Sequence, residues 1–346
     1  MAGTWTSQNK ILPGAYINVV TNVPLSITPG DRGTVVILQE LSAGTDGAIY
    51  TITATEQAYP DGATAADKKL VNLALQNAKT VKLFKLKANH TDEDLTAALD
   101  VLRTENFNVL VYPYDTGREE EKTAIVTWVT AMRDDEGVWC QAVLANKAAD
   151  NEAIVNVVQG VSLSGTTSLT AADMTAWVGG ATAGASIVTS NTGKKVLDAI
   201  DVSPRFTRSE MEAAVTAGKF IFKVDSAQNV TVVTDINTLT TVSAAKGEMF
   251  KKNRVIRTVD GIRSDITAIF ESTYSGKTNN NDAGRLLLKS ALIDYFTTLL
   301  NMGAIQDFSS EDVTVTKGTA IDAVLVEANV QPVDSMEKFY ITVNLS

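Results

Sequence analysis

The chain has very little of the side-chain chemistry that enzymes and metalloproteins rely on. Its 346 residues include a single cysteine, Cys140, and a single histidine, His90. One cysteine excludes a disulfide within the chain and favours a reducing compartment. Cys140 lies in the apolar run 138–144, so we expect it to be buried and unreactive.

One histidine also cannot build a zinc site that needs several histidine and cysteine ligands. His90 stands just before a helix start, where an exposed loop position is expected. We assign no catalytic residue and no metal ligand. Only catalysis by carboxylates alone stays open.

Positive charge and long apolar runs are scarce as well. The formal net charge is −10 and the isoelectric point is near 4.8, which argues against nucleic acid as a partner. No run of about 18 apolar residues is present to span a membrane. The first residues lack a basic region followed by an apolar one, which disfavours a secretory signal. We therefore expect the chain to remain cytoplasmic while it assembles, without contacting a membrane itself.

Two glycine-containing segments partly match nucleotide-binding loops, but one lacks the preceding strand and the other lacks residues of the motif. The segment 178–184 follows a helical pattern instead of a strand, so we expect a close-packed turn there. Near Gly193-Lys194, Val188 replaces the first glycine of a phosphate-binding loop and Lys195 replaces its hydroxyl residue. No cofactor is expected.

The sequence carries strand-forming, apolar residues near both of its ends. Near the start these are Tyr16, Ile17 and Val19, and near the end they are Tyr340, Ile341 and Val343. Chain ends are usually polar and frayed. An extended end with unpaired backbone groups can instead add itself to the sheet edge of a neighbour. The two ends therefore indicate a polymer-forming protein with inter-subunit arms.

Changes of pattern along the chain predict five segments. They are an N-terminal arm and linker (1–29), a small β-rich domain (30–90), an α/β domain (91–245), a C-terminal α+β domain (246–335) and a C-terminal arm (336–346). In the third segment strands alternate with helices, which predicts a mainly parallel sheet. Its helix starts are marked by Thr91 with Asp94, Thr170 with Asp173 and Thr207 with Glu210. A long helix is predicted at 285–302, ending at Gly303.

One stretch of this acidic chain is locally basic. Between residues 246 and 263, six basic residues accompany only two acidic ones. A basic surface would suit an acidic protein partner. Equally open is a scattered, solvated face whose arginines pair with carboxylates of the same subunit. The candidate residues for a partner-facing surface are Lys251, Lys252, Arg254, Arg257 and Arg263.

Five motifs follow one another along nearly the whole chain. They are Leu-Pro-Gly-Ala-Tyr-Ile at 12–17, Asp-Ile-Asn-Thr-Leu-Thr-Thr at 235–241, Asn-Arg-Val-Ile-Arg-Thr-Val-Asp at 253–260, Tyr-Ser-Gly-Lys-Thr-Asn-Asn at 274–280 and Pro-Val-Asp-Ser-Met-Glu-Lys-Phe-Tyr at 332–340. In this order they resemble the contractile tail sheath proteins of phage tails and R-type bacteriocins.

The resemblance implies a non-catalytic, subtilisin-like α/β domain and subunits that stack in rings around a rigid inner tube. It implies that the N-terminal arm of one subunit and the C-terminal arm of another complete a sheet on a third. The basic residues between 251 and 263 would then face the tube. The expected partners are further copies of the chain, the inner tube protein, and baseplate and tail terminator proteins, in a particle that is later released.

Two alternatives stay open on the sequence. A related contractile injection or secretion system would use the same architecture. A carboxylate-dependent hydrolase would use the α/β domain, although no nucleophile–base pair is recognisable in it.

Overall fold

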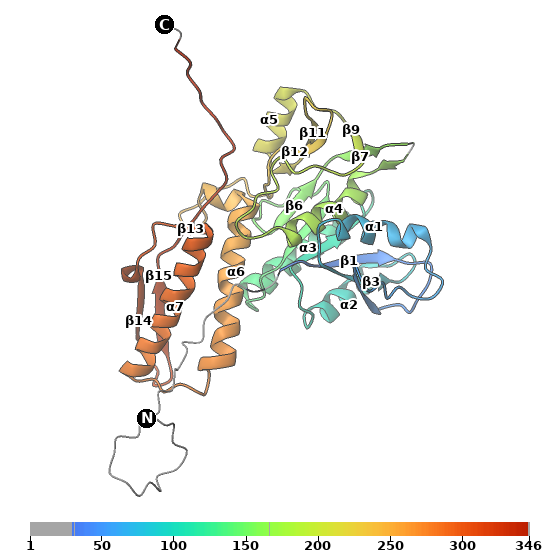
Figure 1. Cartoon of the computed structure of the whole chain (residues 1–346). Helices are drawn as coiled ribbons and strands as arrows, with labels where there is room; N and C mark the ends of the chain where they lie inside the picture. The colour runs from blue at the N-terminus through green and yellow to red at the C-terminus, as the bar shows by residue number, and fades with distance from the viewer. Residues whose placement is uncertain (1–29, 31, 166, 345–346) are drawn as a thin grey trace, which may run out of the picture.

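The computed structural model describes residues 30, 32–165 and 167–344. Figure 1 shows two bodies side by side: an α/β body, and a C-terminal body made mainly of long helices. The connecting segment 233–247 lies between them in sequence. The C-terminal end of the chain extends away from both bodies (Figure 1).

A seven-stranded sheet forms the centre of the α/β body. Six strands run parallel, and β2 is antiparallel at one edge. This confirms the predicted mainly parallel sheet. In spatial order the strands are β10 (Lys219–Phe220), β6 (Ile154–Val157), β5 (Gln141–Ala145), β4 (Val109–Tyr112), β1 (Thr34–Glu40), β3 (Thr80–Leu86) and β2 (Ile49–Thr53).

The boundary predicted at residue 90 does not separate two sheets. Strands β1 and β3, from the segment 30–90, pair with each other, and β1 pairs with β4 of the next segment. The prediction of a separate small β-rich domain is therefore wrong. Its strands were visible in the sequence, but their pairing partners lie beyond the expected boundary.

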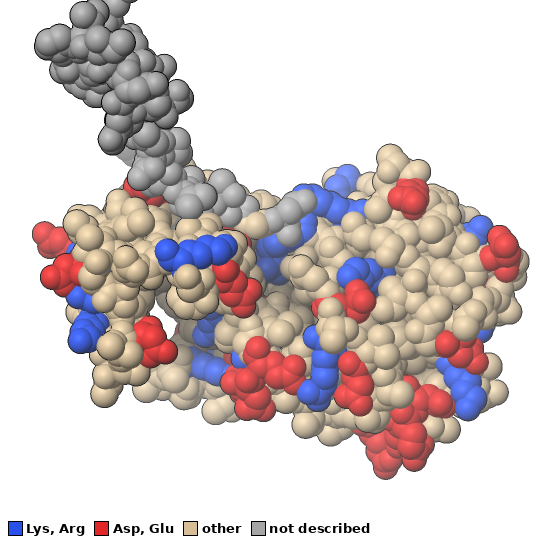
Figure 2. All heavy atoms as spheres, turned by 90° about the horizontal axis from the view of Figure 1, so that it is seen from below, with Lys and Arg blue, Asp and Glu red and all other residues tan. Residues whose placement is uncertain are grey.

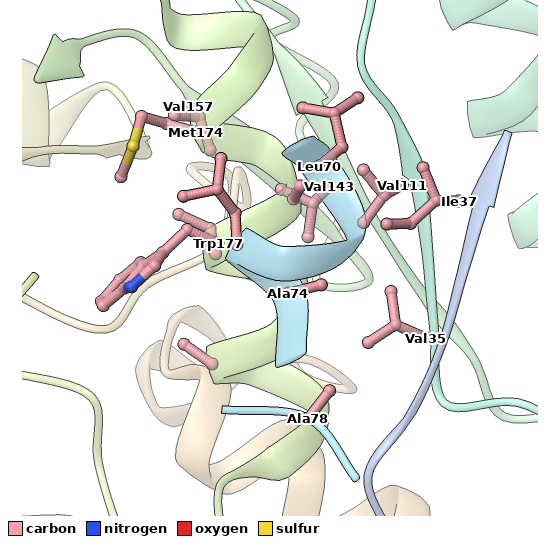
Figure 3. Close-up of a cluster of buried hydrophobic side chains, with 14 of the residues drawn as sticks. Val35, Ile37, Leu70, Ala74, Ala78, Val111, Val143, Val157, Met174 and Trp177 are labelled. Atoms are coloured by element: carbon pink, nitrogen blue, oxygen red, sulfur yellow. The ribbon is translucent and has the colours of Figure 1, made fainter. Parts of the chain in front are cut away.

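Helices cover both faces of this sheet, which explains why its central strands are apolar on both sides. On one face lie α1 (Ala65–Leu75) and α4 (Ala171–Gly184), and on the other lie α2 (Asp92–Leu102) and α3 (Glu119–Asp134). Figure 3 shows α1 and α4 packed together over the sheet, with Trp177 and Ala74 among the buried side chains. The predicted capping boxes at Thr91 and Thr170 are confirmed.

The glycine-rich segment 178–184 is helical, so the expected turn is wrong. Its glycines allow α4 to approach its neighbours closely. A Cβ at Gly180 would meet the backbone oxygen of Ala74 at 2.2 Å, and one at Gly184 would meet that of Asn77 at 1.9 Å. The close packing was expected, but the segment achieves it within a helix.

A smaller lobe completes the α/β body. It contains the three-stranded sheet β8-β7-β9, the hairpin of β11 and β12, and helix α5 (Figure 1). The capping box at Thr207 opens α5 as predicted. The bounds are β7 (Gly160–Leu163), β8 (Ser168–Leu169), β9 (Ala199–Ser203), α5 (Arg208–Thr216), β11 (Phe222–Val224) and β12 (Val230–Val232).

The C-terminal body is built on two long helices. After a 3₁₀ turn (Glu248–Lys251) comes α6 (Asn253–Ile269), which continues into a π-helical turn (Phe270–Tyr274) and is followed by α7 (Asp282–Met302). Gly303 ends α7 in the left-handed region at φ 74°, as predicted. Two short antiparallel sheets follow, of β13 (Ile305–Gln306) with β16 (Gln331–Pro332) and of β14 (Val313–Lys317) with β15 (Val324–Ala328), the latter pair preceded by a 3₁₀ turn (Ser310–Asp312). Within the described part of the chain, no helix combines the length and apolarity needed to cross a bilayer.

Candidate assembly surfaces

The C-terminal tail carries large apolar side chains into solvent. Its last backbone hydrogen bond to the body runs from the Val333 amide to the Ala304 oxygen, at 3.0 Å. Further along, Tyr340 is 91% exposed, Ile341 80% and Val343 74%. The strand-forming residues near the end are thus not paired with any described residue; the segment is extended and leaves the body (Figure 1). The other predicted arm residues, Tyr16, Ile17 and Val19, lie outside the described residues.

Alternation along the tail gives it one apolar face. In an extended chain, side chains two residues apart point to the same side. Phe339, Ile341 and Val343 therefore share one face, and Tyr340 and Thr342 share the other. This pattern is typical of a strand with one face against a core, yet none of the described residues covers either face.

Among the residues that the structure describes, the sheet of β14 and β15 has no partner strand at either edge. The strands pair from Val313 with Ala328 to Lys317 with Val324, and no other described strand pairs with either of them. Strand β14 packs against α7, and Val313 is fully buried. On β15, however, Leu325 is 59% exposed and Val326 43% exposed. The C-terminal body therefore offers free backbone groups beside uncovered apolar surface.

A buried ionic network joins the C-terminal body to the α/β body. Both oxygens of Asp235 are used: Asn253 donates to Oδ1 at 2.9 Å, and Arg257 donates to Oδ2 at 2.9 Å. The backbone N–H of Asn191 also donates to Oδ2, at 2.9 Å. Burial acts to raise the pKa of Asp235, but Arg257 and these hydrogen bonds outweigh burial and hold the pKa below its usual range. Asp235 is therefore ionised and fixed between the two bodies.

A second buried ion pair supports the same junction. Arg133 of α3 binds Asp260 of α6 through two nitrogen–oxygen contacts of 2.8 Å each. The side chains are 5% and 1% exposed. A bidentate, desolvated pair of this kind fixes the relative orientation of the two elements that carry it. The motifs at 235–241 and 253–260 thus have a structural role in locking the two bodies together.

This network corrects part of the predicted basic surface. Arg257 is fully buried and Arg254 is 8% exposed, so the prediction that they face a partner is wrong for these two residues. Both guanidinium groups bind groups of the same subunit instead. Arg257 forms an ion pair with Asp235, and Arg254 donates to the backbone oxygen of Gly303. The alternative of arginines paired within the subunit applies to Arg257.

The other three basic residues are also engaged. Lys251 pairs with Glu248, Lys252 pairs with Glu337 of the tail, and the Arg263 guanidinium lies 4.0 Å above the Trp139 ring centroid. On the face shown in Figure 2, basic and acidic side chains are interspersed among other residues, which cover most of the surface. A tube-facing role for Lys251, Lys252 and Arg263 stays a prediction.

His90 is buried, so the exposed loop position expected for it is wrong. Its Nδ1 lies 2.6 Å from Glu40 Oε1 and its Nε2 lies 2.8 Å from the Tyr112 hydroxyl. Since both ring nitrogens are occupied, neither is free to exchange a proton with a substrate in this structure. Cys140 is 1% exposed, as expected, and burial raises the pKa of its thiol to about 12.

Comparison with known proteins assigns the chain to a family. The model of the phage tail sheath protein central domain matches residues 88–238, and that of the phage tail sheath C-terminal domain matches residues 245–346. The tail sheath protein of Clostridium phage phiCD119 is 30% identical over 280 residues, covering 78% of this chain and 76% of that protein. The chain belongs to the phage tail sheath family.

Solved structures of sheath proteins share the fold. The sheath tail protein of Desulfitobacterium hafniense is 32% identical, with a TM-score of 0.83 over 95% of this sheath chain and 99% of that chain. The helical sheath of the anti-feeding prophage in its contracted state is 17% identical, with a TM-score of 0.73 over 97% of this chain and 99% of that one, and shows the fold alone.

Some relatives are considerably longer. YqbK of Bacillus subtilis is 36% identical over 263 residues, which cover 74% of this sheath chain but 56% of YqbK. The chain thus spans little more than half the length of that curated relative.

Sequence reasoning missed the role of Glu337. It lies inside the tail motif at 332–340, but its partners Thr192, Thr234 and Lys252 are distant in sequence. A carboxylate between Met336 and Lys338 was the only signal available. It does not indicate which lysine it binds.

Proposed function

We propose that this chain is a structural subunit of a contractile tail sheath. It polymerises helically around an inner tube and contracts to drive that tube through a target envelope. The chain itself is not an enzyme, in keeping with a buried His90 whose ring nitrogens are both occupied.

One observation carries the proposal: the same chain presents a free strand and a sheet with open edges. The tail offers an apolar face of Phe339, Ile341 and Val343, and the β14–β15 sheet offers unpaired edges beside exposed Leu325. A strand donated by one copy to the sheet of another satisfies the backbone groups of both. Because donor and acceptor are different surfaces, the contact is heterologous, and it generates an open helix when its rotation does not close into a ring.

The magnitudes explain why many contacts are needed. Full burial of three side chains such as Phe339, Ile341 and Val343 contributes roughly 5–9 kcal/mol. Ordering about five tail residues costs a comparable roughly 5–10 kcal/mol. One donated strand is therefore marginal, and each copy has to make several such contacts for a stable lattice. The N-terminal residues Tyr16, Ile17 and Val19 would supply a second strand.

The buried junction suits a subunit that moves as a rigid body. Asp235 with Arg257 and Arg133 with Asp260 hold the two bodies together, while the tail remains the extended part. Contraction would then rearrange packed subunits along their extended connections. The free energy would come from interfaces between subunits, since the segments considered as nucleotide loops lack the required pattern.

The proposed partners follow from this role. They are further copies of the chain, an inner tube protein, and baseplate and tail terminator proteins. Lys251, Lys252 and Arg263 are the tube-facing candidates that remain. The assembled sheath would form in the cytoplasm and leave as part of a phage tail or bacteriocin particle. A sheath of a related injection or secretion system is the alternative, supported by the shared fold of the anti-feeding prophage sheath.

Electron microscopy of the purified chain tests the proposal. We expect hollow cylinders from the full chain, alone or with its tube protein. A chain ending at Glu337 should stay folded and monomeric. Long cylinders from the truncated chain would show that the lattice does not depend on the tail.

A further inference from the structure

The Glu337 carboxylate lies where the tail leaves the body, and it is fully engaged. Thr192 donates to Oε1 at 2.6 Å, Thr234 donates to Oε2 at 3.1 Å, and Lys252 donates to Oε2. Ser335 of the tail donates to Oε1 at 3.3 Å. We call Glu337 with Thr192, Thr234 and Lys252 the tail clasp.

The clasp connects three regions that are distant in sequence. Thr192 follows α4, Thr234 follows β12, and Lys252 immediately precedes α6. The Glu337 side chain is only 13% exposed and Thr234 is 8% exposed, so the contact is sheltered from water. Burial acts to raise the pKa of Glu337, but the hydrogen bonds and the charge of Lys252 hold it below its usual range. The carboxylate is therefore ionised and charge-assisted hydrogen bonds hold it.

Along the described part of the chain, the clasp is the last point at which the body holds the tail. None of residues 338–344 forms a hydrogen bond or ion pair with another described residue. With the clasp closed, the free tail begins at Lys338; without it, the last contacts are the Val333 amide and the Asp334 carboxylate, 3.7 Å from Lys252 Nζ, and the free tail begins at Ser335. The shorter free segment samples less space, which raises the effective concentration of the strand at a fixed neighbouring edge.

We propose that Glu337 is a positioning residue, whose clasp on Thr192, Thr234 and Lys252 fixes the point and direction in which the tail strand is presented to a second copy of the chain. This inference rests on the proposed sheath function. The clasp connects the strand to the junction of the two bodies. When the rigid subunit moves, the strand that is bound to the neighbouring copy therefore moves with it.

Trypsin cleavage after Lys338 tests the clasp in the unassembled full chain. The protease must bind extended residues on both sides of the bond, and the clasp holds Glu337 and Ser335 against the body. Cleavage then reports the open fraction of the clasp. We expect the native chain to be cut at least about tenfold more slowly than a synthetic peptide of residues 333–344, since charge-assisted hydrogen bonds hold the tail.

Glu337→Gln removes the charge and keeps the shape. The reference is a peptide of residues 333–344 that carries the same change. The cleavage rate of the variant chain should rise to within about threefold of the rate of that peptide, because the ionic contact is lost. Thr234→Val removes one donor and should give an intermediate rate. Glu311→Gln, at an exposed position, is the matched control and should behave as the wild type. The thermal midpoint of Glu337→Gln should fall by no more than about 4 °C, because the clasp is a single contact at the tail and the buried core is unchanged.

Sedimentation under assembly conditions tests the positioning role. Glu337→Gln should need at least about fivefold more protein than the wild type or Glu311→Gln to form polymers, because its strand is presented less often. Equal cleavage of native wild type and peptide would overturn the clasp. Lost protection with unchanged assembly would overturn the positioning role. Failure of the wild type to polymerise would overturn the proposed function, and the positioning role with it, whatever the protease result.

Discussion

The pair of Arg133 and Asp260 allows the strength of the junction to be predicted from its geometry. Two contacts of 2.8 Å join side chains that are 5% and 1% exposed. Asp260→Ala would leave the Arg133 guanidinium buried without its carboxylate, keeping only the hydrogen bond to the Cys140 oxygen at 3.0 Å. Stranding a buried charge in this way typically costs about 3–5 kcal/mol. Replacing both residues, as in Arg133→Met with Asp260→Leu, should recover most of that loss because no charge remains unpaired.

Urea unfolding followed by circular dichroism measures these changes. The matched control is the exposed pair Arg208 and Glu212, whose side chains are 90% and 67% exposed. Glu212→Ala should change the free energy of unfolding by less than about 0.5 kcal/mol. The reasoning is refuted if Asp260→Ala costs less than about 1 kcal/mol, or if the double variant is no more stable than the single one.

Three further predictions concern the α/β body. Burial acts to raise the pKa of Asp67, but hydrogen bonds from Ser42 and Thr64 outweigh it and lower the pKa from 3.8 to about 2. The ionised carboxylate therefore stabilises the fold above the unfolded pKa, and this stabilisation is lost as the pH falls. Between about pH 5 and pH 2, the free energy of unfolding of the wild type should fall by about 2 kcal/mol more than that of Asp67→Asn in unfolding titrations. Gly180→Ala should destabilise by at least about 1–3 kcal/mol in urea unfolding, because its Cβ would meet a backbone oxygen at 2.2 Å, whereas Gly247→Ala has open space and serves as the control. The Cys140 thiol, whose pKa burial raises to about 12, should react with a thiol reagent only after unfolding, and rapid reaction of the native chain would contradict its burial.

Patterns confined to one element were readable from the sequence. Helix starts at Thr91, Thr170 and Thr207 and the end of α7 at Gly303 depend on residues three or four apart, and the structure confirms them. The mainly parallel sheet followed from alternating strands and helices.

Contacts between distant segments were not readable. The pairing of β1 with β4, which removes the boundary at residue 90, depends on tertiary structure. From the sequence alone Arg257 is expected on the surface, whereas in the structure it is buried and paired with Asp235. The helical Gly180 shows how tertiary packing overrides local propensity, because a glycine normally disfavours a helix and here permits close contact with α1.

Hydrogen exchange of the tail amides in monomer and polymer tests strand donation between copies most directly. If the tail joins the β14–β15 sheet of another copy, the amides of residues 339–343 should exchange freely in the monomer and become protected in the polymer, together with an outer edge of that sheet. Tail amides that still exchange at the monomer rate in intact cylinders would contradict the account.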